Sequence, residues 1–182
     1  WSCKMGRKPE ITQSDLESFW YWKNYHDLVA EEARYFPLEM YAPNESICLV
    51  GAGPLPLTAI VLLQETGKKV TCVDIDAAAC HAAERFIFKA GLKESINVVC
   101  TDGAQYNYRL HPHVLLASLV PNKGEVIRRI YETSDNPSIA IRSAERLHTL
   151  LYDPVDETDP ELAKCSLSFR TAYKPDIINT TL

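Results

Sequence analysis

The chain has 182 residues, of which 46% are hydrophobic and 24% are charged, and its formal net charge is −5. This length predicts one globular domain with a substantial core. The negative charge, without a basic stripe, argues against nucleic acid as a partner. No apolar run approaches the roughly 20 residues that cross a bilayer, so we expect no membrane partner, and no signal peptide is visible.

The six cysteines form no Cys-x-x-Cys pair, and three of them, Cys48, Cys72 and Cys100, lie in apolar runs. A free thiol in such a run behaves as a small hydrophobic side chain. We therefore expect reduced cysteines in a cytoplasmic protein, and no metal site.

The N-terminal part predicts one aromatic-rich helix. Residues 1–13 are polar without a period and predict a loose start. A capping box at Ser14–Glu17 starts a helix that runs to about Phe36. Tyr25 and Glu32 are two helical turns apart, so they share a face. The aromatic residues of this helix need a cover, which favours a homodimer.

The stretch from residue 46 to residue 76 organises the rest of the chain. The apolar run Ile47–Val50 predicts a strand buried on both faces. Gly51 and Gly53 follow, where a chain leaving a strand needs unusual backbone angles. After a predicted helix, Val70–Val73 forms a second strand with Asp74 at its carboxyl end. An acid about 20 residues past the glycines is placed to bind ribose hydroxyls. The alternative is a strand, turn and helix that hold no ligand.

Two prolines in the glycine turn decide which cofactor to expect. A dinucleotide site would have a third glycine at position 56, but Pro56 stands there and Pro54 precedes it. Prolines suit a first helical turn but remove amide donors that a pyrophosphate would use. We therefore expect a nucleoside cofactor without phosphates, S-adenosylmethionine (SAM).

Further strands and helices alternate along the rest of the chain. Asp102 follows the third strand and either binds the adenine amino group or closes an ordinary turn. Arg142, at the end of the fifth strand, either holds a carboxylate or forms a surface ion pair. The expected elements are a helix to about Ala90, strands Ile96–Cys100 and Val114–Leu119, a helix Gly124–Thr133, and strands Ile139–Ile141, Ser166–Ala172 and Ile177–Leu182.

This succession predicts an α/β fold, a class I methyltransferase-like (Rossmann-like) three-layer sandwich with a mostly parallel sheet, preceded by the aromatic-rich helix. We expect an N-terminal helical segment over residues 1–45 and a SAM-binding domain over residues 46–182.

The glycine turn also carries a family resemblance. The sequence from Gly51 to Thr58, Gly-Ala-Gly-Pro-Leu-Pro-Leu-Thr, resembles the signature of nicotianamine synthases and their bacterial relatives, which make opine metallophores or azetidine-2-carboxylate. The Pro-Leu-Pro is the specific part. Further similar blocks extend the resemblance from Ser14 to the end of the chain: residues 18–32, 117–119, 141–143, 151–154 and 178–181.

The resemblance implies transfer of the 3-amino-3-carboxypropyl group of SAM to an amine or amino acid, or cyclisation of SAM itself, with release of methylthioadenosine. Two alternatives stay open, a SAM-dependent small-molecule methyltransferase and a non-catalytic SAM-binding module. The family also has a catalytic glutamate further upstream that has no clear match in this sequence.

The resemblance further implies roles for individual residues. Tyr25 would act on the reacting amine, and Glu32 would lie near its ammonium end. The implied cofactor-binding residues are Gly51, Gly53, Pro54, Asp74, Asp76, Asp102 and Leu119, and the implied substrate-binding residues are Arg142, Tyr152 and Asn179.

Overall fold

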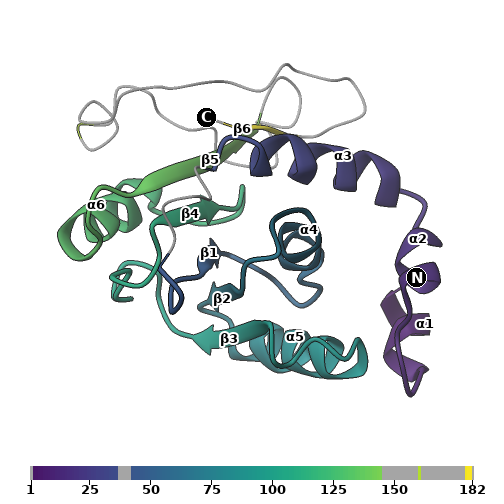
Figure 1. Ribbon diagram of the computed structural model, residues 1–182. Coiled ribbons are helices and arrows are strands. Elements are labelled where there is room, and N and C mark those ends of the chain that lie inside the picture. Colours follow the sequence, from purple (N-terminus) through teal and green to yellow (C-terminus); the bar gives the residue numbers. More distant parts are fainter. Residues whose placement is uncertain (1, 37–41, 145–159, 161–178, 182) are drawn as a thin grey trace.

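The computed structural model describes residues 2–36, 42–144, 160 and 179–181. Within them a six-stranded sheet has the order β3-β2-β1-β4-β5-β6, and helices lie on both of its faces (Figure 1). The strands are β1 (Ile47–Val50), β2 (Val70–Asp74), β3 (Ile96–Cys100), β4 (His113–Leu116), β5 (Ser138–Ala144) and β6 (Asn179–Thr181). The helices are α1 (Ser2–Arg7), α2 (Gln13–Glu17), α3 (Trp22–Ala33), α4 (Leu57–Thr66), α5 (Ala77–Lys89) and α6 (Lys123–Thr133).

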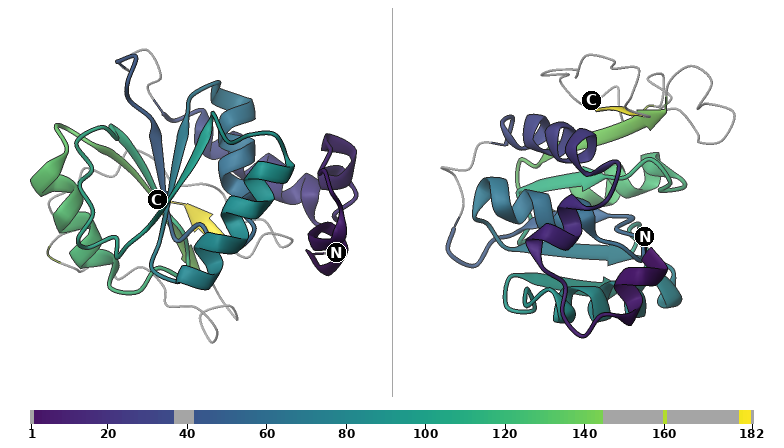
Figure 2. Two further views of the ribbon diagram at one scale, coloured as in Figure 1. Left: turned by 90° about the horizontal axis from the view of Figure 1, so that it is seen from below. Right: turned by 90° about the vertical axis from the view of Figure 1, so that its right-hand side faces the viewer.

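The first five strands are parallel, and the chain order reverses beside β1. The chain runs from β1 to β2 to β3 on one side and then returns to place β4 on the other side of β1. Right-handed crossovers put α4 and α5 on one face and α6 on the opposite face, as Figure 2 shows. This arrangement confirms the predicted methyltransferase-like sandwich. In such folds ligands bind at the carboxyl ends of the two strands where the chain order reverses, which here are β1 and β4.

Each central strand is buried on both faces, so the sheet has two cores. Ile47 and Leu49 of β1 pack with the core beneath α3, α4 and α5. Cys48 and Val50 alternate with them and join the core beneath α6. Because α3, α4 and α5 cover one face of the sheet and α6 covers the other, both faces of the central strands are buried. This explains why the sequences of these strands are almost entirely apolar.

The sixth strand lengthens β5 beyond its predicted end. β6 pairs antiparallel with β5, with Thr181 opposite Arg142 and Asn179 opposite Ala144. The prediction ended this strand at Ile141, so Arg142 lies within β5 and not after it. The predicted strand Ser166–Ala172 lies outside the described residues.

The N-terminal helix prediction was wrong in three respects. Residues 2–7 form α1, and Met5 is buried. The capping box is formed by Thr12 and Asp15, and not by the predicted Ser14–Glu17. The predicted single helix is broken between Ser18 and Tyr21, so α3 starts at Trp22.

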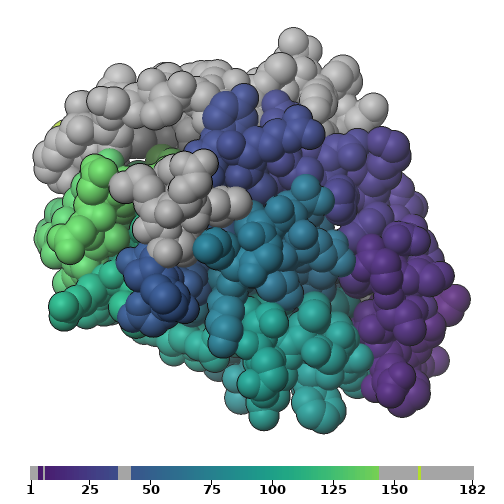
Figure 3. Space-filling model, in the orientation of Figure 1, coloured from purple at the N-terminus to yellow at the C-terminus, as the bar shows by residue number. Residues whose placement is uncertain are grey.

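The segment that joins α1 to α2 lies beside the end of α5. The backbone N–H of Ile11 donates to the carbonyl of Lys89 at 2.9 Å, and Figure 3 shows the purple N-terminal residues against the teal residues of α5. None of the described helices is long and apolar enough to cross a membrane. The division into an N-terminal segment and a SAM-binding domain at residue 45 stays a prediction.

Candidate active site

The glycine turn after β1 is fastened to the acid that ends β2. Gly51 and Gly53 both have left-handed backbone angles, with φ of 77° and 67°. The N–H of Gly53 donates to Asp74 Oδ2 at 2.8 Å. Asp74 Oδ1 accepts from the N–H of Asp76 at 3.0 Å. Asp74 therefore holds the turn after β1 and the turn after β2 together, and its remaining lone pairs lie at the carboxyl edge of the sheet.

Gly51 has a steric reason to be glycine. A Cβ built on it would lie 2.7 Å from Val120 Cγ2 and 3.2 Å from the Ala117 Cβ. A Cβ built on Gly53 would meet nothing within 4 Å. The turn is therefore closely packed on the segment after β4 at Gly51 and open at Gly53.

Two predicted cofactor acids have local structural roles. Asp76 is the N-cap of α5 and accepts from the N–H of Ala78 at 2.8 Å. Asp102 accepts from the N–H of Ala104 at 2.9 Å, which is a turn of the kind that aspartate often closes at a strand end. Both still lie at the carboxyl edge, so a further contact with a nucleoside stays a prediction.

Apolar side chains are exposed at the same edge. Ile75, between Asp74 and Asp76, is 64% exposed, and Leu119, in the turn after β4, is 71% exposed. Pro54 is also exposed, whereas Pro56 is buried at the N-cap of α4. These groups follow strands β1, β2 and β4, whose carboxyl ends lie at one edge.

A buried ion pair joins α3 to β5. Arg142 Nε donates to Glu32 Oε1 at 2.9 Å, and Arg142 Nη2 donates to Glu32 Oε2 at 2.8 Å. The exposed fractions are 1% for Glu32 and 4% for Arg142. Two parallel bonds of this kind are strong and fix the geometry of both groups.

Thr58 and Tyr25 complete a cluster of four polar side chains. Arg142 Nη1 donates to Thr58 Oγ1 at 3.1 Å, and the Tyr25 hydroxyl is hydrogen-bonded to Thr58 Oγ1. The guanidinium carbon of Arg142 lies 5.7 Å from the Tyr25 ring centroid. Burial acts to lower the pKa of Arg142, but Glu32 and Tyr25 outweigh it and raise that pKa above its usual range. The guanidinium therefore stays charged.

The cluster gathers residues that the sequence analysis treated separately. Tyr25 and Glu32 face the same way on α3, as their spacing predicts, and both reach Arg142. The described bonds of Arg142 to a carboxylate go to Glu32, which the sequence analysis did not pair with it. Thr58 is a functional candidate that the sequence analysis does not single out, and its position two residues after Pro56 is the signal that it lies at the glycine turn.

Two further residues, Tyr152 and Asn179, were predicted to bind the substrate. Tyr152 lies outside the described residues. Asn179 lies in β6, opposite Ala144. Among the residues that the structure describes, no group of three or more histidine, cysteine, aspartate and glutamate side chains is placed to hold a metal ion.

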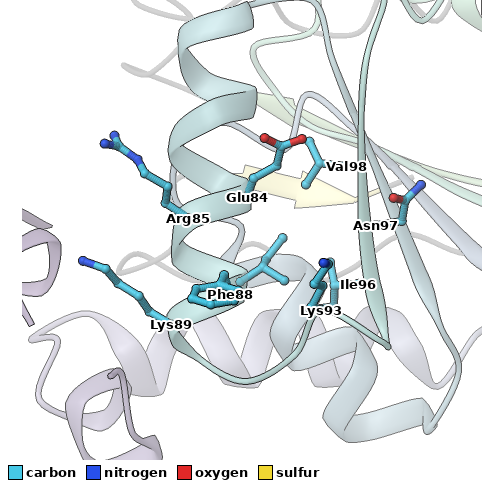
Figure 4. Close-up of a pocket in the computed structure, with 9 residues that line it drawn as sticks. Glu84, Arg85, Phe88, Lys89, Lys93, Ile96, Asn97 and Val98 are labelled. Atoms are coloured by element: carbon cyan, nitrogen blue, oxygen red, sulfur yellow. The ribbon is translucent and has the colours of Figure 1, made fainter. Parts of the chain in front are cut away.

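A groove of about 440 Å³ lies away from these residues, between α5 and the edge strand β3. Figure 4 shows Phe88 near the end of the helix, and Glu84 pointing toward Val98. The groove includes no residue of the cluster or of the glycine turn. We therefore do not place the predicted ligand there.

The chain is similar to several known proteins. Residues 9–182 match the family model described as nicotianamine synthase protein. The chain is 27% identical over 157 residues to an L-histidine 2-aminobutanoyltransferase of Yersinia pestis, covering 85% of this chain and 56% of that relative. It is 29% identical over 117 residues to a protein of the same name from Pseudomonas aeruginosa, covering 63% of this chain and 44% of that relative. The chain thus spans about half the length of these curated relatives.

Solved structures are similar in fold. A mutant of MtNAS in complex with S-adenosylmethionine has a TM-score of 0.80 at 24% identity, covering 99% of this chain and 68% of that one. MtNAS in complex with MTA and tNA gives 0.79 at 24% identity, covering 99% and 66%. An RNA methyltransferase of Salinibacter ruber in complex with S-adenosyl-L-homocysteine gives 0.61 at 14% identity, covering 87% and 88%.

Proposed function

The chain belongs to the nicotianamine synthase protein family, and on that premise we propose that it transfers the 3-amino-3-carboxypropyl group of SAM to an amine, with release of methylthioadenosine. The observation that carries this proposal is the hydrogen bond of 2.8 Å between the Gly53 N–H and Asp74. This bond connects the proline-bearing turn to Asp74, the residue proposed to bind the ribose hydroxyls. Both lie at the edge of the sheet where open α/β folds bind ligands.

The proposed reaction follows from the chemistry of a sulfonium. The amine nitrogen attacks the Cγ of the methionine chain, the new C–N bond forms, and the Cγ–S bond breaks. The sulfur keeps the electron pair and leaves as neutral methylthioadenosine. Three carbons of the sulfonium can react, so the enzyme must hold Cγ in line with the amine.

The nucleophile must be a neutral amine, so a proton has to leave it. We assign this step to Tyr25, whose hydroxyl lies in the polar cluster beside the glycine turn. The Tyr25 oxygen accepts the proton of the amine while the phenolic proton passes to solvent, so Tyr25 relays the proton and is itself unchanged. Glu32 is less suited to this step, because both of its oxygens accept from buried Arg142. We propose that Glu32 acts as a positioning residue that holds Arg142.

The acceptor is proposed by analogy with the relatives. Two of them are named L-histidine 2-aminobutanoyltransferase, so L-histidine is the first acceptor to test, followed by other amino acids. We also propose a cytoplasmic location, since Cys48, Cys72, Cys80 and Cys100 are free thiols. A homodimer stays a proposal, supported by Trp20, which is 85% exposed.

The deciding experiment is mass spectrometry of the protein incubated with SAM, with and without L-histidine. Methylthioadenosine together with a conjugate that carries one aminobutyrate unit is the expected result. Methylthioadenosine and a ring-closed amino acid from SAM alone would indicate the cyclising variant. Adenosylhomocysteine without methylthioadenosine would instead identify a methyltransferase, and SAM binding without any turnover would identify a binding module.

A further inference from the structure

Thr58 contacts two other members of the polar cluster through its single hydroxyl group. It lies in the first turn of α4 and is 4% exposed. Its oxygen meets Arg142 Nη1 of β5 at 3.1 Å and the hydroxyl of Tyr25 on α3. One hydroxyl group therefore joins three elements that are far apart in the sequence.

The direction of one of these bonds is fixed by charge. A guanidinium only donates, so Thr58 Oγ1 must be the acceptor from Arg142. One lone pair and one proton of the threonine hydroxyl then remain for Tyr25. Thr58 can accept from the Tyr25 hydroxyl, or it can donate to the Tyr25 oxygen when the phenolic proton points to solvent.

The anchor behind Thr58 is rigid. The guanidinium that donates to it is held by two bonds to the buried Glu32 carboxylate, and rotation of Arg142 would break both of them. The Thr58 oxygen is thus set by the ion pair, and Tyr25 is in turn set by Thr58.

We propose that Thr58 is a positioning residue, which transmits the fixed geometry of the Glu32–Arg142 pair to the hydroxyl of Tyr25. This inference rests on the proposed function, in which Tyr25 relays the proton of the reacting amine. Thr58 itself touches neither the amine nor SAM in this assignment.

The test compares Thr58→Val, which removes the hydroxyl but keeps the branched shape, with Thr58→Ser, which keeps the hydroxyl. Loss of one hydrogen bond involving a charged group predicts a fall of about 10- to 100-fold in kcat for Thr58→Val. The Kd for SAM should stay within about twofold, and Thr58→Ser should retain most of the activity. A matched control is Thr71→Val, since Thr71 is also buried and its hydroxyl meets Ser46 Oγ at 3.1 Å, outside the cluster. Equal kcat values for Thr58→Val and Thr71→Val, or no rescue by serine, would overturn the proposal.

A double-mutant cycle with Tyr25→Phe separates this inference from the proposed function. If Thr58 acts through Tyr25, Thr58→Val should reduce kcat much less in the Tyr25→Phe background than in the wild type. If the wild-type protein forms no product from SAM, the proposed function fails. The same four proteins are then compared by the urea concentration at which each is half unfolded. Non-additive midpoints would then support the link between Thr58 and Tyr25, and additive midpoints would overturn it.

Discussion

Glu32 and Arg142 are 110 residues apart in the sequence, and they form a two-point ion pair inside the protein, between α3 and β5. The side chains are 0% and 5% exposed, respectively. The pair links α3 to β5, which lies on the opposite side of β1 from β3. It also fixes the charged group against which Thr58 and Tyr25 are arranged.

Breaking this pair should destabilise the protein strongly. Glu32→Gln leaves a buried guanidinium without its counter-charge, and a loss of about 3–5 kcal/mol in the free energy of unfolding is expected. The measurement is urea denaturation. The double variant Glu32→Leu with Arg142→Met should recover much of the lost stability, because apolar replacement of a buried pair is often tolerated, but it should not recover turnover. A single variant that unfolds like the wild type would contradict the buried pairing.

Asp74→Ala and Asp76→Ala should differ in their effect on SAM binding. Asp74→Ala removes an acceptor for the Gly53 N–H and for the expected ribose hydroxyls, so SAM binding should weaken by about 1–3 kcal/mol. Asp76→Ala removes the N-cap of α5, so it should lower the free energy of unfolding by about 0.5–2 kcal/mol with a smaller effect on SAM. Calorimetric titration with SAM and urea denaturation check the two sides. Equal loss of SAM affinity in both variants would instead support the predicted contact of Asp76 with the cofactor.

The local part of this site could be predicted from the sequence, and the long-range part could not. Strand β1, the glycine turn and Asp74 follow one another within 28 residues, from 47 to 74, so their spacing carries the information. The pairing of Glu32 with Arg142 depends on how α3 packs against the sheet. The separation of the two residues in the sequence gives no information about that packing. The early end predicted for β5 has a similar cause, since that strand is extended by pairing with β6.

The N-terminal errors have a local cause. Thr12 with Asp15 and Ser14 with Glu17 both fit the capping pattern, and the structure uses the first. The hydroxyl of Ser18 donates to the carbonyl of Asp15 at 2.6 Å, and the chain leaves the helix there. A run of aromatic residues gave no signal for that break, because aromatic side chains are compatible with helix and turn alike.

Gly51 and Gly53 should respond differently to alanine. Both need a left-handed backbone, which costs a non-glycine residue about 1–2 kcal/mol. Gly51→Ala should cost about 1–3 kcal/mol more, because its Cβ would overlap Val120 and overpacking carries that penalty. Urea midpoints of the two variants test this order. Combining Gly51→Ala with Val120→Ala should reduce the excess, and an unchanged excess would show that the contact with Val120 is not its source.

The stability of the protein should also depend on pH through His111. This side chain is buried, and burial lowers its pKa below 6.5, partly opposed by the carbonyl of Ser46. Its Nε2 meets the Tyr106 hydroxyl at 2.9 Å. Above pH 6.5 the ring is neutral in both the folded and the unfolded state. Below that pH the unfolded chain binds the proton first, so the free energy of unfolding should fall as the pH drops from 6.5 toward the folded-state pKa.

The measurement for His111 is the free energy of unfolding at a series of pH values between 7 and 5. His111→Gln should be less stable than the wild type at pH 7, because Tyr106 and Ser46 lose their partner, but its stability should fall less steeply with decreasing pH. His81→Gln is the control, since the His81 side chain is 78% exposed and its removal should leave the slope unchanged. If the wild type and His111→Gln lose stability in parallel, another group is responsible for the pH dependence.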